Sequence, residues 1–80
     1  MGHFPPVSVK DVEAVLKALG YERRPQKATS HVNWVIEDAS GFRKVTVDAN
    51  NAPFKDQSLV FILRQMGISK KQFFEVLRGL

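Results

Sequence analysis

The sequence contains no cysteine, and it contains no apolar run long enough to cross a membrane. Without thiols there is neither a disulfide framework nor a thiolate metal site. A membrane-spanning helix needs roughly 20 predominantly apolar residues. The first ten residues also lack the charged region and the long apolar stretch of a signal peptide. We therefore expect a cytoplasmic protein without a membrane segment.

Several catalytic signatures are missing as well. The chain has no glycine-rich phosphate loop, no nucleophile elbow, no paired-carboxylate motif and no ligand cluster at metal-binding spacing. We therefore expect no metal and no cofactor. Of the two histidines, His3 lies in residues 1–7, where Pro5 and Pro6 predict an extended arm. His31 is the histidine that a folded domain can use.

What is present is enough for one compact domain, which we place at residues 8–80. The 80 residues are 44% hydrophobic, so a small core can form. Twelve Lys and Arg against eight Asp and Glu give a net charge of +4. This balance favours polyanions such as nucleic acid, or acidic partners, without choosing between them.

A first helix is predicted from Ser8 to Gly20. Ser8 suits the N-cap, and Asp11 places an acid where the helix dipole favours one. Gly20 stands where a left-handed residue commonly ends a helix. The predicted core-facing positions, at helical spacing, are Val9, Val12, Val15, Leu16 and Leu19.

Strands follow the first helix. Pro25 interrupts "YERRPQK", so that strand should be short, bulged or at a sheet edge. The segment from His31 alternates with period two, "DASG" supplies a turn, and "FRKVTV" returns as an antiparallel partner. The side chains predicted to face the core are Val32, Trp34, Ile36, Val45 and Val47. This parity assigns Trp34 to the core rather than to base stacking.

Two helices are expected to close the chain. Gly67 ends the first of them, and Ser69 with Gln72 forms a capping box for the second, flanked by Ile68 and Phe73. Their predicted apolar stripes are Leu59, Ile62, Leu63 and Met66, and then Phe73, Val76, Leu77 and Leu80. The order predicts an α+β fold: a helix, a three-stranded antiparallel sheet, a helix and a short C-terminal helix. If the helices cover one sheet face, the other stays in solvent.

Strand alternation then predicts that His31 lies on this open face, opposite to the buried side chains. An amide, a hydroxyl and several cations should share the face. They are Asn33, Thr46 and Lys44 from the hairpin, with Arg23, Arg24 and Lys27 from the neighbouring edge. Asp48, Asn50 and Asn51 are interpreted as residues that shape the following loop.

Such a surface suits phosphodiester chemistry. An imidazole titrates near pH 6.5 in general, so it can act as acid or base at neutral pH. Cations and hydroxyl donors stabilise the charge that develops on phosphorus, and this mechanism needs no metal. A lone exposed histidine is more often an ordinary surface residue. The residue pattern by itself therefore leaves both interpretations open.

The stretch "QKATSHVNW", followed by "GFRKVTVDANNAPFKDQSLVFILRQMGISKKQFFEVL", resembles the HicA family of toxin components, as does the opening helix that ends "LKALGY". The resemblance covers nearly all the chain after Ser8. It implies a double-stranded-RNA-binding-domain-like fold, an mRNA interferase activity and a HicB-type antitoxin partner. It also implies that His31 is catalytic. The expected RNA-binding residues are Arg23, Arg24, Lys27, Ser30, Asn33 and Lys44.

The sequence departs from the family pattern in two places. Ala28-Thr29-Ser30-His31 lacks the glycine usually found before Ser-His, which stiffens the approach to His31. Many members also carry a histidine just after the third strand, where this chain has the segment 48–51, "DANN". The second departure removes a possible second acid or base.

Two alternatives to a nuclease remain open. A non-catalytic RNA-binding module with the same fold would contact phosphates and 2′-hydroxyls without cleavage. An interaction protein would use its basic surface only to dock an acidic partner. For the toxin, Lys70 and Lys71, in the first turn of the last helix, and Arg64 are a candidate docking patch for acidic side chains or phosphate. The resemblance makes a HicB-type antitoxin the expected partner, which should cover part of the basic surface and block His31. RNA affinity separates the interaction protein from the nuclease and the RNA-binding module. Cleavage of RNA separates the nuclease from the RNA-binding module.

Overall fold

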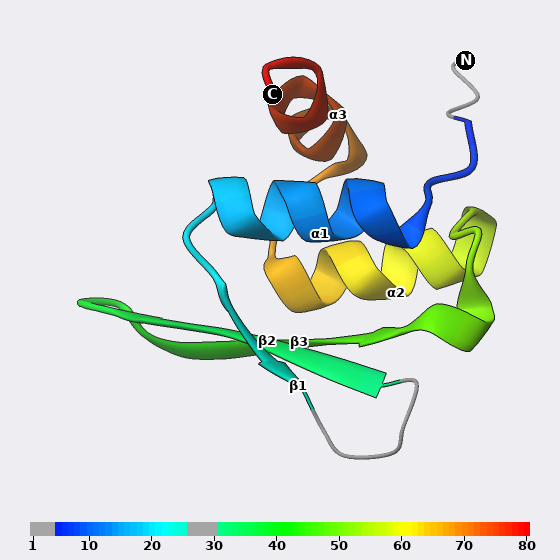
Figure 1. Ribbon diagram of the computed structural model, residues 1–80. Coiled ribbons are helices and arrows are strands. Elements are labelled where there is room, and N and C mark those ends of the chain that lie inside the picture. The colour runs from blue at the N-terminus through cyan, green and yellow to red at the C-terminus, as the bar shows by residue number, and fades with distance from the viewer. Residues whose placement is uncertain (1–4, 26–30) are drawn as a thin grey trace.

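A computed structural model of the chain describes residues 5–25 and 31–80. Its elements are α1 (Val9–Ala18), β1 (Glu22–Pro25), β2 (His31–Asp38), β3 (Gly41–Asp48), the 3-10 turn η1 (Ala49–Asn51), α2 (Asp56–Met66) and α3 (Lys70–Arg78). The strands form one antiparallel sheet in the order β1-β2-β3. All three helices lie on the same side of it (Figure 1). The predicted α+β architecture and element order are confirmed.

The first helix begins and ends where its capping residues predict. The Ser8 hydroxyl accepts a hydrogen bond from the Asp11 N–H at 3.1 Å. Gly20 follows the helix with φ +97°, a value that a side chain disfavours. The fully buried side chains of α1 are Val12, Val15 and Leu16.

The two C-terminal helices are also capped as predicted. Gly67 ends α2 in the left-handed conformation, and its N–H donates to the Leu63 carbonyl at 2.8 Å. Ser69 and Gln72 exchange hydrogen bonds of 3.1 Å and 2.9 Å at the start of α3. One core assignment is wrong: Leu80 is 64% exposed. Because α3 stops at Arg78, Leu80 lies beyond the last helical turn and leaves the stripe.

The β2–β3 hairpin reverses through the two residues Ala39 and Ser40. The Asp38 carboxylate accepts hydrogen bonds from the Ser40 N–H at 2.8 Å and from the Ser40 hydroxyl at 2.5 Å, which brace the turn. Trp34 lies directly opposite Val45, and both are buried against the helices. The predicted inward parity of the hairpin is therefore confirmed.

The core extends into the segment that we expected to be an arm. Val7 is 1% exposed and forms an isolated antiparallel bridge with Phe54. Its N–H donates to the Phe54 carbonyl at 2.9 Å, and the Phe54 N–H donates back at 2.7 Å. This bridge fastens the chain before α1 to the loop that leads into α2.

Helix α2 is held against the edge strand β3 by one glutamine and one arginine. The Thr46 N–H donates to Gln65 Oε1 at 2.9 Å, and Arg43 Nη1 donates to the Gln65 carbonyl at 3.2 Å. The guanidinium also packs over Gly67, where a Cβ would lie 2.7 Å from Arg43 Nη1. These contacts hold the C-terminal half of α2 against β3.

No helix in the described ranges combines the length and the apolar character that crossing a bilayer requires.

Candidate functional site

The sheet face opposite the helices is open (Figure 1). The register of the hairpin places the predicted site residues of β2 and β3 on this face. Side chains directly opposite each other in an antiparallel pair share a face. Because Trp34 and Val45 face the helices, the pairs on either side of them face outward. These outward pairs are His31–Asp48, Asn33–Thr46 and Val35–Lys44, each in register.

The central feature of the site is a contact between His31 and Asp48. His31 Nε2 lies 3.1 Å from Asp48 Oδ2, with the side chains 49% and 21% exposed. Asp48 Oδ1 accepts a hydrogen bond from the Asn50 N–H at 2.9 Å and so caps η1. One carboxylate therefore shapes the loop, as predicted, and also engages the imidazole, which we did not predict.

A sequence signal for this pair does exist. In a hairpin with a two-residue turn, two residues at the same distance from the turn lie opposite each other. His31 and Asp48 are at the same distance from Ala39–Ser40. Asp48 also lies in the segment where many HicA-family members carry their second histidine. The structure therefore brings this segment next to His31.

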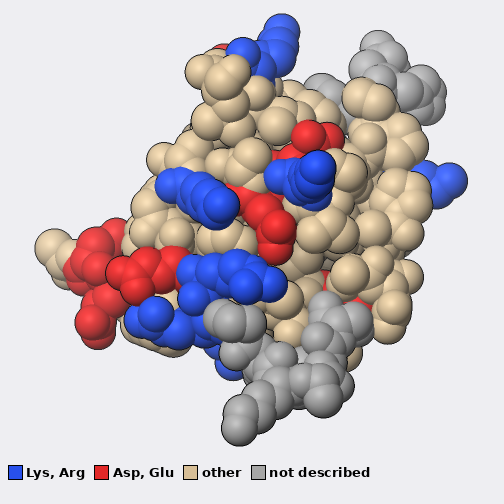
Figure 2. Space-filling model, viewed as in Figure 1, with Lys and Arg blue, Asp and Glu red and all other residues tan. Residues whose placement is uncertain are grey.

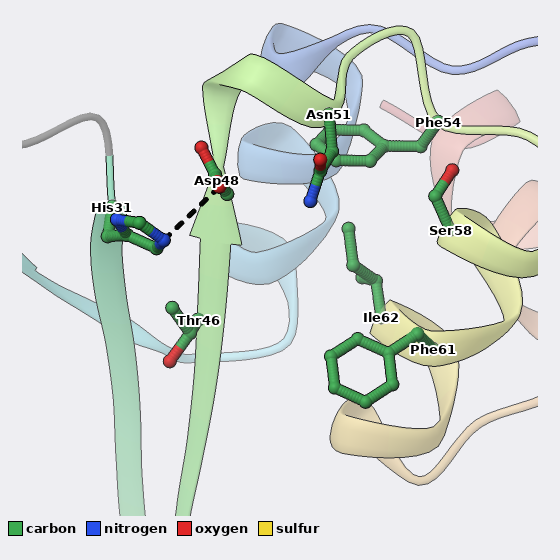
Figure 3. Close-up of a pocket in the computed structure, with 8 residues that line it drawn as sticks. All are labelled: His31, Thr46, Asp48, Asn51, Phe54, Ser58, Phe61 and Ile62. Atoms are coloured by element: carbon green, nitrogen blue, oxygen red, sulfur yellow. Dashed lines mark ion pairs between the residues drawn. The ribbon is translucent and has the colours of Figure 1, made fainter.

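His31 and Asp48 form part of the wall of a surface cleft of about 160 Å³. Figure 3 shows the cleft between the end of β3 and the first turns of α2. Its sheet side is polar, and its helix side is largely apolar. The lining residues are His31, Thr46, Asp48, Asn51, Phe54, Ser58, Phe61 and Ile62. A substrate bound here would contact both the imidazole–carboxylate pair and α2.

The next row of the open face carries three of the polar residues predicted to lie on it, Arg24, Asn33 and Thr46. Thr46 Oγ1 donates to Asn33 Oδ1 at 2.8 Å, so the hydroxyl and the amide are already paired with each other. Arg24 lies opposite Asn33 on β1, and its Nη1 is 3.1 Å from Glu22 Oε2. The predicted RNA-binding residues Arg24 and Asn33 are therefore neighbours on one face.

Arg23 does not lie with them. It pairs with Trp34 and therefore faces the helices, where its Nε is 3.9 Å from Glu13 of α1. Its neighbour Arg24 faces the opposite way, because side chains alternate along a strand. Lys27 and Ser30, the other two predicted RNA-binding residues, lie outside the described residues.

The charge on the open face is mixed. Within the described ranges, its cations are Arg24 and Lys44, and its carboxylates are Glu22, Glu37 and Asp48. Figure 2 shows acidic side chains gathered over the β2–β3 turn, and basic side chains over α1 and β1. From the sequence we expected a positively charged open face. The described part of that face instead offers two separate cations for phosphate contacts.

An imidazole beside a carboxylate is suited to proton transfer. The carboxylate holds the ring in one orientation. Among the described residues, no group of three or more His, Cys, Asp or Glu is placed to hold a metal ion. The chemistry that the described side chains themselves can supply is acid–base chemistry at His31.

No protein-family model matches the chain, and neither a curated protein nor a solved structure matches it significantly.

Proposed function

We propose that the protein is an RNA endonuclease of the HicA-like toxin type. In this proposal His31 exchanges protons with the substrate, and Asp48 holds the His31 ring in position. The observation that carries this proposal is the 3.1 Å contact between His31 Nε2 and Asp48 Oδ2 at a solvent-accessible cleft. The resemblance around Ser30-His31 supports the same assignment. The order helix, three antiparallel strands, helix supports a double-stranded-RNA-binding-domain-like fold.

The proposed reaction is an intramolecular attack on phosphorus. His31 removes the proton from a ribose 2′-hydroxyl, the 2′-oxygen bonds to phosphorus, and the bond from phosphorus to the 5′-oxygen breaks. The 5′-oxygen takes up a proton from solvent, which leaves a 2′,3′-cyclic phosphate and a 5′-hydroxyl, and His31 returns the proton that it accepted to solvent. General acid–base catalysis of this kind contributes roughly 10²- to 10⁴-fold in rate.

The proposed partner is a HicB-type antitoxin, and its candidate docking patch lies away from the cleft. Lys70 and Lys71 are exposed in the first turn of α3, just beyond the short Gly67–Ser69 link. Arg64 is exposed in the last turn of α2, on the other side of that link. Cations at a helix N-terminus are disfavoured by the helix dipole, so acidic groups of a partner would stabilise them.

The proposal is tested by incubating single-stranded RNA with purified protein in excess EDTA. His31→Ala should slow cleavage by roughly 10²- to 10⁴-fold. Asp48→Asn keeps an oxygen for the Asn50 N–H but loses the negative charge, so we expect an intermediate rate. Asp38→Asn, at the opposite end of the hairpin, is the matched control and should cleave like the wild type.

Equal RNA degradation by wild type and His31→Ala would identify a contaminating nuclease and remove His31 from the mechanism. Tight RNA binding by a wild type that does not cleave would establish the alternative, a non-catalytic RNA-binding module. The capping of η1 by Asp48 is compatible with that alternative, because it stabilises the loop without any chemistry.

A further inference from the structure

Phe61 is the most exposed large apolar side chain in the described part of the chain, at 67%. It lies on α2 beside the buried stripe formed by Leu59, Ile62, Leu63 and Met66, yet it does not join it. Single exposed apolar residues are common and need no explanation of their own. Phe61 differs because it lines the same cleft as His31 and Asp48.

The position of Phe61 relative to the sheet is fixed by Gln65. Residues four apart lie on the same side of a helix, so Phe61 and Gln65 share the side of α2 that faces β3. Gln65 Oε1 accepts the Thr46 N–H at 2.9 Å, and Thr46 itself lines the cleft. Figure 3 shows the Phe61 ring on the helix side, across from Thr46, Asp48 and His31 on the sheet side.

The two sides of the cleft match the two parts of a nucleotide. The sheet side offers an imidazole, a carboxylate and a hydroxyl, which suit a ribose and its phosphate. The helix side offers an exposed aromatic ring, which suits the face of a base. Ser58 and Asn51 add polar groups to the lining between them. Aromatic side chains beside a site for the sugar–phosphate backbone are how many proteins bind single strands.

We propose that Phe61 forms a nucleobase subsite, in which its ring stacks on the base of a nucleotide adjoining the phosphate that is cleaved. This inference rests on the proposed function and adds to it a site that positions the RNA strand. Stacking accepts any base, because every base has a π-face, so the subsite positions the strand rather than selecting one sequence. It also favours single strands, whose bases can leave their neighbours.

Phe42 provides a matched control. It is 64% exposed, close to the exposure of Phe61, but it lies at the other end of the hairpin. There it shares a surface hollow with Glu22, Glu37 and Arg24. The two carboxylates outnumber the one guanidinium, which is itself paired with Glu22, so the hollow is a poor site for phosphate. Both phenylalanines offer the same ring to solvent, and only Phe61 lies at the His31 cleft.

The experiment measures binding in a His31→Ala background, so that the RNA stays intact. Fluorescence anisotropy gives the Kd for a short labelled single-stranded RNA and for a series in which each base in turn is removed. Phe61→Ala should weaken binding about 5- to 150-fold, the range found for loss of one stacked base. Phe61→Trp should retain binding, and Phe42→Ala should leave it unchanged.

The abasic series supplies the decisive comparison. At one position, removal of the base should cancel the effect of Phe61→Ala, because the ring then has nothing to stack on. Equal Kd values for Phe61→Ala and Phe42→Ala would overturn the subsite. So would a Phe61→Ala effect that persists in every abasic RNA, or one confined to binding of a protein partner.

The binding readout is independent of cleavage. A wild type that fails to cleave, together with a base-dependent effect of Phe61→Ala, would refute the nuclease and keep the subsite. Normal cleavage with no such effect would refute the subsite and keep the nuclease. Circular dichroism of each variant checks folding, and Phe61→Trp keeps the proposal testable if Phe61→Ala unfolds.

Discussion

Replacing Gly67 with alanine should destabilise the protein through two separate effects. Gly67 has φ +75°, where an L-residue costs roughly 1–2 kcal/mol. A Cβ would also lie 2.7 Å from Arg43 Nη1 and 3.1 Å from Arg43 Cζ. The guanidinium must therefore move and weaken its 3.2 Å hydrogen bond to the Gln65 carbonyl. Because that bond is exposed, we assign it only about 0.5–1 kcal/mol.

The net magnitude follows by subtracting the effect on the unfolded chain. Alanine restricts the unfolded state more than glycine does, which stabilises the fold by roughly 0.4–1 kcal/mol. The balance is a loss of about 1.5 kcal/mol in the free energy of unfolding. For a domain of this size, that corresponds to a fall of about 6–12 °C in Tm.

Thermal and urea denaturation of Gly67→Ala, compared with Gly79→Ala, measure this loss. Gly79 has φ −82°, and a Cβ there would meet its nearest neighbours at 3.6 Å, so Gly79→Ala should change stability by no more than about 0.5 kcal/mol. In an Arg43→Ala background, the Gly67→Ala cost should shrink by the contribution of the guanidinium. Equal costs for the two glycines would refute the strain argument. An unchanged cost without Arg43 would refute the contact.

Two further measurements address charge. Hydrogen bonds from the Ser40 hydroxyl and N–H hold the pKa of Asp38 below its ordinary 3.8. The ionised carboxylate therefore stabilises the folded state above pH 3.8, and this contribution to the free energy of unfolding is lost as the pH falls through the lower folded-state pKa. The urea midpoint of the wild type should therefore exceed that of Asp38→Asn by more at pH 7 than at about pH 2, and an equal difference would contradict the assignment. RNA affinity should fall with salt, and Lys44→Ala or Arg24→Ala should each make the log–log slope less negative by about 0.7, one phosphate contact on a single strand. Arg23→Ala, which removes a cation from the other face, should leave the slope unchanged; a slope that responds equally to all three would show that the open face is not the RNA surface.

The elements that the sequence predicted correctly are those with local signals at both ends. Ser8 and Gly20 mark the bounds of α1, and Gly67 and Ser69 mark the break between α2 and α3 within one residue. Each of these capping residues meets a requirement of the local backbone, so the end of the helix can be predicted without knowing the tertiary structure. Leu80 was assigned wrongly because apolar spacing alone does not show where a helix stops. The burial of Val7 was missed because it depends on the bridge between Val7 and Phe54, which joins two segments far apart in the sequence.

The candidate site was predictable only as far as strand alternation reaches. Parity placed His31 on the open face and Trp34 in the core. The face of Arg23 depends on the register of β1 with β2, which nothing in the short "YERRPQK" segment specifies. Asp48 was overlooked because its loop role was a sufficient local explanation. Phe61 reaches the cleft because α2 packs on β3, through its buried stripe and the Gln65 contact, and such contacts between distant segments leave no local pattern.

Because the hairpin turns at Ala39–Ser40, the site depends on the lengths of the two hairpin strands as much as on the identity of its residues. His31 and Asp48 meet because the two arms of the hairpin are equally long, so substitutions along either arm leave their alignment intact. Inserting or deleting one residue in one arm would shift the register and turn one of the partners toward the core. Sequences descended from this one can therefore vary widely along the hairpin, but a change in its length would separate the pair from a point many residues away.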